Sequence, residues 1–142
     1  MNFTKQKSMS QMQLIYQGEL RCEASHFSGA RLITDAPPDN HGKGESFSPT
    51  DLLCISLASC MVTIMGIEAR KLEISFEGIT AEIKKGMLAN PRRVGKISIV
   101  LQMPAFLKDH PHRVTLEQAG LNCPVALSVH PDIDKDITFV YA

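Results

Sequence analysis

The sequence lacks a net charge, because its 142 residues carry 15 basic and 15 acidic side chains. Without an excess of either sign, no long-range attraction draws the chain toward nucleic acid or an anionic membrane surface. Arg92 and Arg93 stand together in a predicted turn with no aromatic residue nearby, which gives a stacking site for single-stranded nucleic acid little support. We therefore expect neither a nucleic-acid partner nor a membrane partner.

Two kinds of hydrophobic segment are also missing. No stretch reaches the roughly 18 uncharged apolar residues of a membrane span, and the run Leu52–Ile67 falls short of that length. The first twelve residues are polar and contain Lys5 and Lys7 but no apolar core, unlike a secretory signal. We expect a flexible tail over residues 1–12, a single domain over residues 13–142 and a cytoplasmic location.

Cysteine is sparse and widely spaced, with four residues at positions 22, 54, 60 and 123 and no C-x-x-C pair. This spacing argues against a zinc knuckle and a thioredoxin-type motif, and a secreted disulfide scaffold would be shorter and richer in cysteine. In a reducing compartment, isolated thiols are either buried packing residues or reactive groups. The choice between these two interpretations decides the function.

Apolar residues alternate with polar ones along several segments, and this period of two predicts strands. Turn residues dominate 36–44, which we expect to be a mobile loop. The expected strands are one or two within 12–26 with a turn at Gly18, then 30–35, 76–86, 95–103 and 136–142. The expected helices are one starting at Ser48, one over 110–119 ended by Gly120, and a short one capped by Asn122. This order of elements predicts an α+β domain.

The stretch GESFSPTDLLCISLASCM (44–61) predicts the start of a long helix. Ser48 is a good N-cap, Pro49 suits the first helical position, and Asp51 faces the positive end of the helix dipole. From Leu52 to Ile67 the helix is apolar on nearly all faces, so it should lie inside the structure. One small domain covers only one face of a helix, which suggests that a second subunit covers the remainder as a homodimer.

Three cysteines are candidates for chemistry or for packing. Cys54 and Cys60 lie six residues apart in the long helix, a rotation of about 240° that places them on different faces. Either can be a small hydrophobic core residue. Cys123 follows a predicted cap and precedes Pro124, where exposed N–H groups and the helix dipole lower a thiol pKa. The same residues are also compatible with an ordinary helix start.

Charged and imidazole side chains offer weaker candidates. Glu45 precedes the long helix and could hold an arginine that stabilises a thiolate, although most surface glutamates are only solvated. Arg21 and Arg31, in the N-terminal strands, are the candidate partners. His110 and His112 form an H-x-H pair, but a metal site needs three or four ligands and no others are evident by spacing. We interpret them as surface histidines.

The segment 44–61, followed by GLNCPVALSV, resembles the OsmC/Ohr family, the osmotically inducible protein C and organic hydroperoxide resistance proteins. The shared pattern is S-P-x-x-L near a helix start, a cysteine in that helix and a second cysteine in a C-[PS]-[VI] segment. The resemblance covers about residues 13 to 142. It implies an OsmC-like α+β fold with antiparallel sheets and a long buried central helix. It also implies an intertwined homodimer with two active sites at the interface.

The resemblance further implies a thiol-dependent peroxidase that reduces organic hydroperoxides. Cys60 would be the peroxide-reactive thiolate and Cys123 the thiol that resolves its sulfenic acid into a disulfide. Glu45 and an arginine, best matched by Arg21 with Arg31 as the alternative, would stabilise the thiolate. No metal or flavin is required, and the family reductant is often a dithiol such as lipoamide. The alternative function is a non-catalytic small-molecule-binding or stress-associated dimer, and the other two cysteines are assigned to packing.

Overall fold

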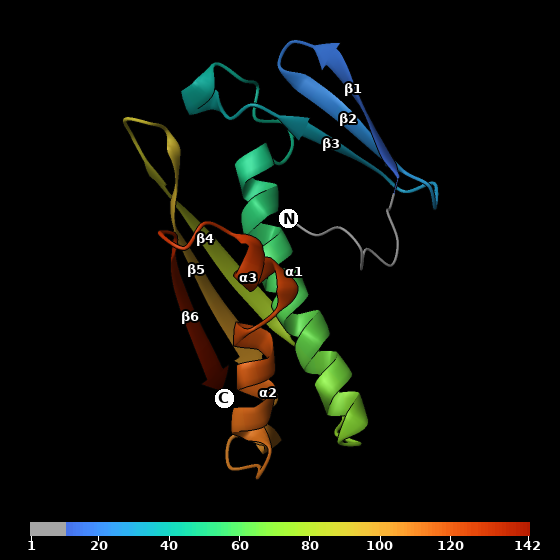
Figure 1. Ribbon diagram of the computed structural model, residues 1–142, viewed down its shortest axis with the longest axis vertical. Helices are drawn as coiled ribbons and strands as arrows, with labels where there is room; N and C mark the ends of the chain where they lie inside the picture. Colours follow the sequence, from blue (N-terminus) through green and yellow to red (C-terminus); the bar gives the residue numbers. More distant parts are fainter. Residues whose placement is uncertain (1–10) are drawn as a thin grey trace, which may run out of the picture. The chain divides into compact units, whose positions relative to one another are not determined.

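The computed structural model describes residues 11–142 and contains helices and two small sheets, in agreement with the α+β prediction (Figure 1). The chain divides into an N-terminal unit that ends at Pro49 and a C-terminal unit that begins at Thr50. Of the tail predicted over residues 1–12, the first ten residues lie outside the described part of the chain. Met12 already belongs to the first strand.

Three antiparallel strands make up the sheet of the N-terminal unit, in the order β1 (Met12–Gly18), β2 (Arg21–His26) and β3 (Arg31–Asp35). The turn predicted at Gly18 joins the first two. The side chains of Met12 and Tyr16 project from β1 and are 60–68 % exposed, so this strand offers apolar surface that the unit does not cover.

The segment 36–44, predicted to be a mobile loop, carries the short 3-10 helix η1 (Pro38–Asn40). Backbone hydrogen bonds from Gly42 N to Pro37 O (3.0 Å) and from Gly44 N to Ala36 O (3.2 Å) close it on itself. A Cβ atom at position 42 would overlap the Ala36 carbonyl, so only glycine allows this close approach. The loop thus has one defined path from β3 toward the long helix.

The long helix α1 (Pro49–Lys71) begins where the Ser48-Pro49 signal predicts. Its buried residues recur every three or four positions and therefore form one face. They are Cys54, Leu57, Ala58, Met61, Met65 and Ala69. Ile67, on another face, is 48 % exposed, so the single chain covers one face of this helix, as expected for one small domain.

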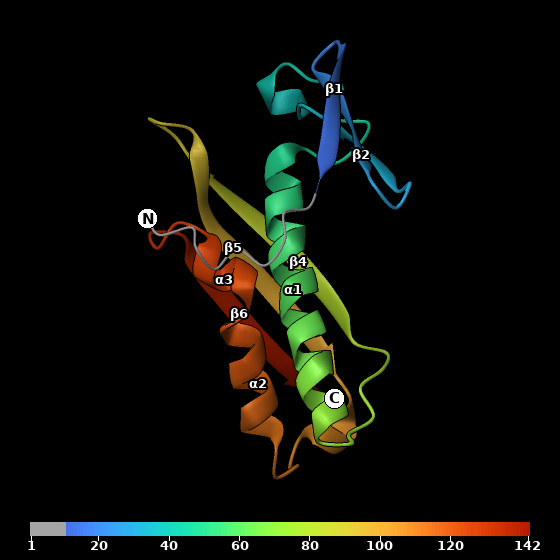
Figure 2. The same ribbon diagram turned by 45° about the vertical axis from the view of Figure 1, so that its right-hand side comes forward.

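The sheet of the C-terminal unit consists of β4 (Thr80–Leu88), β5 (Arg93–Met103) and β6 (Asp134–Tyr141) in that order. The alternation predicted for 95–103 is confirmed, because every second residue of β5 is buried against the helices. These residues are Ile97, Ile99, Leu101 and Met103. Ser98 and Gln102 point to the opposite, polar face. Figures 1 and 2 show the helices on one side of this sheet.

The prediction of antiparallel sheets is wrong for the C-terminal unit, whose sheet is mixed. β4 and β5 are antiparallel, whereas β5 and β6 are parallel, with Ile99 paired to Ile137. Two parallel neighbouring strands need a crossover connection, since the chain must return to the end where it started. Here the crossover contains η2 (Ala105–Leu107), α2 (Arg113–Leu121) and α3 (Pro124–Ser128).

Two predicted helix caps take other roles. Gly120 does not end α2 but lies inside it and is buried, and the helix continues to Leu121. A Cβ at Gly120 would lie 2.8 Å from Met65 Sδ, so glycine here permits close contact between α2 and α1. Asn122 is the C-cap of α2, while Cys123 is the N-cap of α3. Both residue types are typical of helix ends, but Gly120 lies inside α2 and Asn122 caps the end of α2, not the start of α3.

The α1 helix is long and apolar enough to cross a membrane by length and composition alone. The sequence-based exclusion of such a segment was therefore too strict, because it counted only the uncharged run. A core helix of a water-soluble protein has the same composition. In this chain, Leu57, Met61 and Met65 are fully packed into the core of the C-terminal unit.

Candidate functional site

In the N-terminal unit, Arg21 is the centre of a charged network. It begins β2 and lies directly opposite Asp35, the last residue of β3. The guanidinium donates two hydrogen bonds to the Asp35 carboxylate, from Nε to Oδ1 (2.7 Å) and from Nη2 to Oδ2 (2.8 Å). Nη2 also donates to Glu45 Oε2 at 2.9 Å. Arg21 is thus held by two carboxylates from two different segments.

The network favours the charged forms of Arg21 and Asp35. Hydrogen bonds from Arg21 lower the pKa of Asp35, and the backbone N–H of Glu45 adds a further bond to Asp35 Oδ2 at 3.0 Å. The hydrogen bonds to Asp35 and then to Glu45 raise the pKa of Arg21. Asp35 is buried, whereas the Glu45 side chain is 63 % exposed. The result is a permanently charged guanidinium in a fixed orientation.

The structure distinguishes Arg21 from Arg31, the two arginines that the sequence offers as partners of Glu45. Arg21 contacts Glu45, whereas Arg31 forms an ion pair with Glu23 at 2.9 Å and its side chain is 72 % exposed. Arg31 and Glu45 thus have different partners in this structure. We therefore retain Arg21 as the predicted arginine of the site.

Asp35 is the member of this network that sequence reasoning missed. The predicted strands on either side of the turn at Ser28 and Gly29 contain a usable signal. Antiparallel pairing that is symmetric about this turn places Arg21 opposite Asp35, and this register is observed. Opposite charges at such a cross-strand position attract each other. The sequence therefore contained the information needed to predict Asp35, at the end of β3, as the partner of Arg21.

In the C-terminal unit, the structure brings Cys60 and Cys123 together. Cys60 lies on α1 and packs at the edge of the buried cluster that contains Cys123. Cys123 is completely buried, and its sulfur accepts a hydrogen bond from Ala126 N at 3.4 Å. A hydrogen bond between the two cysteine side chains is among the interactions that affect the pKa of Cys123. Both thiols are free.

The predicted lowering of the Cys123 pKa is wrong, because burial outweighs the helix start. Desolvation is the largest effect and raises the pKa of Cys123, and the contact with Cys60 raises it further. The hydrogen bond from Ala126 N acts in the opposite direction but is weaker. Burial therefore favours the neutral form of the Cys123 thiol.

Residues 42–138 match the model of the OsmC-like protein family. The chain belongs to the OsmC-like family. No curated protein matches it significantly. A Psychrobacter arcticus protein, provisionally assigned to the osmotic stress and detoxification response, has 46 % identity over 94 % of this chain and 98 % of its own, with a TM-score of 0.86.

Two more distant structures share the OsmC-like fold. An organic hydroperoxide resistance protein of Legionella pneumophila has 17 % identity over 95 % of this chain and 98 % of its own, with a TM-score of 0.71. A Vibrio cholerae protein, provisionally assigned to organic hydroperoxide resistance, carries captopril in one of its active sites. It has 17 % identity over 97 % of this chain and 96 % of its own, with a TM-score of 0.70.

The other two cysteines of this OsmC-like protein have different surroundings. Cys54 is buried on α1, and burial raises the pKa of its thiol, with nearby Lys85 acting in the opposite direction. Lys85 itself bonds Asp51 Oδ1 at 2.6 Å near the start of α1. Cys22 lies partly exposed on β2. Both positions are compatible with the packing roles that the sequence suggested.

Metal-binding side chains do not cluster in the part of the OsmC-like chain that the structure describes, residues 11–142. No group of three or more His, Cys, Asp or Glu side chains there is arranged to hold an ion. The rings of His110 and His112 lie 5.7 Å apart near the start of α2. This pair alone provides fewer ligands than a structural or catalytic metal centre needs.

Proposed function

We propose that this OsmC-like protein is a thiol-dependent peroxidase that reduces organic hydroperoxides. The observation that carries the proposal is the contact between Cys60 and Cys123, two free thiols from separate elements. A contact of this kind suits a nucleophilic cysteine and a resolving cysteine that must form a disulfide. Fold relatives that include organic hydroperoxide resistance proteins add support for this class of reaction.

In the first step of the proposed reaction, the Cys60 thiolate attacks the outer oxygen of the hydroperoxide. The O–O bond breaks, an S–O bond forms, and the alkoxide leaves and takes up a proton to become an alcohol. Cys60 is oxidised to a sulfenic acid while the peroxide is reduced. The family resemblance assigns this attack to Cys60, which is partly exposed, whereas Cys123 is fully buried. The apolar side chains around it favour organic peroxides over hydrogen peroxide.

A thiolate next to apolar groups needs a positive charge for stability. We assign this role to Arg21, with Glu45 and Asp35 holding the guanidinium in place. The assignment is supported by the two-sided anchoring of Arg21 and by its raised pKa, which keep the guanidinium charged and fixed within the N-terminal unit. Asp35 and Glu45 act through Arg21 and are positioning residues in this proposal.

In the second step, the Cys123 sulfur attacks the sulfenic sulfur of Cys60. An S–S bond forms, and water leaves with the sulfenic oxygen and the Cys123 proton. A dithiol such as lipoamide then reduces the disulfide by thiol–disulfide exchange and is itself oxidised to a disulfide. The proposal places this cycle in the cytoplasm and requires no metal or flavin.

We further propose that the working form is a homodimer, in which a second copy covers apolar surface that the single chain exposes. The large apolar side chains of β1 are 60–68 % exposed, and β1 is an edge strand. Ile67 on α1 is also exposed. Exposed apolar edge strands are a liability unless another chain covers them. Sedimentation at micromolar concentration should give about twice 15.7 kDa.

The decisive experiment compares Cys60→Ser with Cys123→Ser after one equivalent of an organic hydroperoxide such as cumene hydroperoxide. The first variant should not react, and dimedone should trap no sulfenic acid. The second should react once per site, and its sulfenic acid should persist and oxidise further, because no thiol condenses with it. Wild-type protein should form one disulfide that links the two residues in peptide mapping by mass spectrometry.

Two results would contradict the proposal. A disulfide that contains Cys54 or Cys22 in place of Cys123 would show that the pair is wrongly assigned. Equal and slow peroxide consumption by the wild type and both variants would favour the alternative function, a non-catalytic small-molecule-binding or stress-associated dimer.

A further inference from the structure

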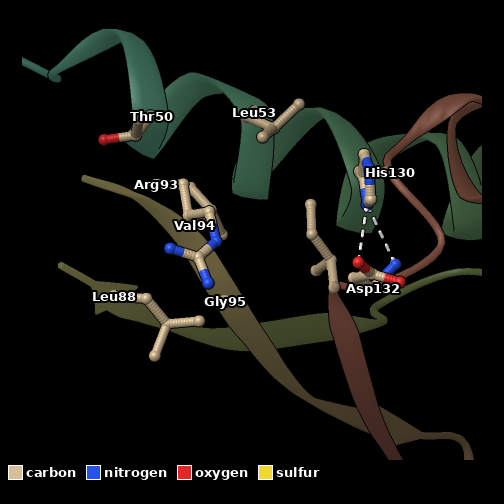
Figure 3. A pocket seen from close by; sticks show the side chains of 9 residues that line it. Thr50, Leu53, Leu88, Arg93, Val94, Gly95, His130 and Asp132 are labelled. Carbon is tan, nitrogen blue, oxygen red and sulfur yellow. Dashed lines mark hydrogen bonds and ion pairs between the residues drawn. The ribbon is translucent and has the colours of Figure 1, made fainter. Parts of the chain in front are cut away.

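A cavity of about 480 Å³ opens in the C-terminal unit, where β4 turns back into β5. Figure 3 shows the side chains that line it, with Thr50 and Leu53 from the first turns of α1 and Leu88 from the end of β4. The segment after α3, including His130, completes the lining. Its volume is within the range of about 300–1,000 Å³ that small-molecule sites have. Neither cysteine of the proposed peroxidase pair contributes to it.

The walls of this cavity are mostly apolar. Leu53, Val94 and Ile133 line it, and the last two are nearly buried, so they present a preformed apolar surface. Leu88 lies across Gly95, where a Cβ would come within 2.4 Å of its side chain. Glycine at position 95 therefore keeps Leu88 against the strand as part of the wall.

Arg93 supplies a positive charge to the same cavity. Its Nη1 atom donates to Pro91 O at 2.8 Å and to Ala89 O at 3.4 Å, which holds the guanidinium to the turn that it follows. In the described chain, no hydrogen bond of Arg93 uses Nε or Nη2. These donors form the fork that matches a carboxylate. A held guanidinium loses less side-chain freedom when it binds a ligand.

His130 adds a second donor to the lining. Its Nδ1 accepts the backbone N–H of Asp132 at 3.1 Å, so the neutral ring carries its proton on Nε2. Asp132 is the one acidic residue among the described lining residues, and its side chain is 89 % exposed. Water therefore screens the Asp132 charge strongly. Figure 3 shows the His130–Asp132 interactions as dashed lines.

We propose that this cavity binds an amphipathic organic anion, an aliphatic carboxylate of medium chain length. The carboxylate accepts hydrogen bonds from Arg93, and the hydrocarbon chain packs on Leu53, Val94 and Ile133. A neutral molecule of the same length cannot form the charge-assisted, bidentate contact with the guanidinium, and a cation of that length is repelled by it. This site is separate from the proposed peroxidase reaction and does not depend on it.

Titration of ¹⁵N-labelled protein with sodium octanoate, followed by two-dimensional NMR, tests this site directly. We expect saturable shifts of the amides of Gly95 and Ile133. Binding of 1-octanol should be about tenfold weaker or worse, as expected for loss of a charge-assisted hydrogen bond. Octylammonium should not compete. Mutation Arg93→Gln should weaken octanoate binding by a similar factor, and Arg92→Gln, next to it in the same turn but outside the lining, should not.

A second variant tests the apolar wall without altering the charge. Leu88→Ala should weaken octanoate binding and leave the much weaker binding of acetate unchanged. Equal affinities for octanoate and 1-octanol, or wild-type affinity in Arg93→Gln, would overturn the proposal. Amide shifts that map outside the cavity, or that do not saturate, would overturn it as well. Peroxidase activity is not a readout, so this site and the proposed function can fail independently.

Discussion

The contact between α2 and α1 at Gly120 gives the sharpest test of the packing. In Gly120→Ala, the new Cβ would lie 2.8 Å from Met65 Sδ, 2.9 Å from Met65 Cγ and 3.6 Å from Met61 O. The first two separations are shorter than van der Waals contact, so something must move. Met65 is completely buried, and its side chain therefore has little space into which it can move.

Two opposing effects set the size of the change. Alanine is better than glycine in a helix interior by up to about 1 kcal/mol, and less near a helix end. Overpacking a close-packed core costs about 1–3 kcal/mol. The free energy of unfolding should therefore fall by about 1–2 kcal/mol in Gly120→Ala. The matched control is Gly66→Ala inside α1, where the nearest atom, Phe76 Cδ1, lies at an ordinary 3.5 Å. That variant should gain up to about 1 kcal/mol.

The assay is urea unfolding followed by far-UV circular dichroism, with all variants at one protein concentration because dimer stability depends on it. The displacement should also reach the proposed active site, since Cys123 N donates to Gly120 O at 3.2 Å. Disulfide formation after organic hydroperoxide should therefore be slower in Gly120→Ala than in Gly66→Ala. If Gly120→Ala is as stable as the wild type while the control behaves as expected, α2 and α1 are not close-packed there.

Three further predictions concern charge and assembly. Glu45→Ala should slow organic peroxide consumption while circular dichroism shows an unchanged fold, and a wild-type rate would mean that Glu45 is only solvated. Because Arg21 lowers the pKa of Asp35, their interaction stabilises the fold above about pH 4 and is lost as pH falls through the lowered value. Asp35→Asn should thus have a lower free energy of unfolding than the wild type at pH 7 in urea unfolding. This difference between variant and wild type should become smaller at pH 3, and a difference that does not change with pH would contradict the prediction. Ile67→Glu should sediment as a folded monomer, whereas an unchanged dimer would exclude this face of α1 from the interface.

Local signals were sufficient to predict much of the fold. Alternation predicted the core strand around Ile99, and the Ser48-Pro49 pair predicted the start of α1, because each depends on neighbouring residues alone. The cap assignments failed for Gly120 and Asn122, although both residue types are typical of helix ends. Gly120 is required by the approach of Met65 from another helix, which no local window contains.

The site shows the same division. Cys60, Cys123, Glu45 and Arg21 came from a family resemblance, and the structure shows the contacts within each pair. The direction of the Cys123 pKa shift could not be predicted, because desolvation depends on the packing of the whole unit and outweighs the local helix start. To predict Asp35 as the partner of Arg21, the pairing register of β2 and β3 must be known, and the sequence gives this register only indirectly. The parallel direction of β6 is likewise a property of the crossover path.

The parallel pairing of β6 with β5 also constrains the order in which the protein can be completed during translation. At about 5–20 residues per second, the crossover between Met103 and Asp134 takes about 2–6 s to synthesise. During this interval one edge of β5 has no partner, although its apolar side chains are already made. Cys60 is also made before Cys123, so in the reaction proposed above the nascent chain carries the attacking thiol before its resolving partner exists. If the proposed reaction holds, a sulfenic acid formed on such a chain has no second thiol to condense with until Cys123 has been added.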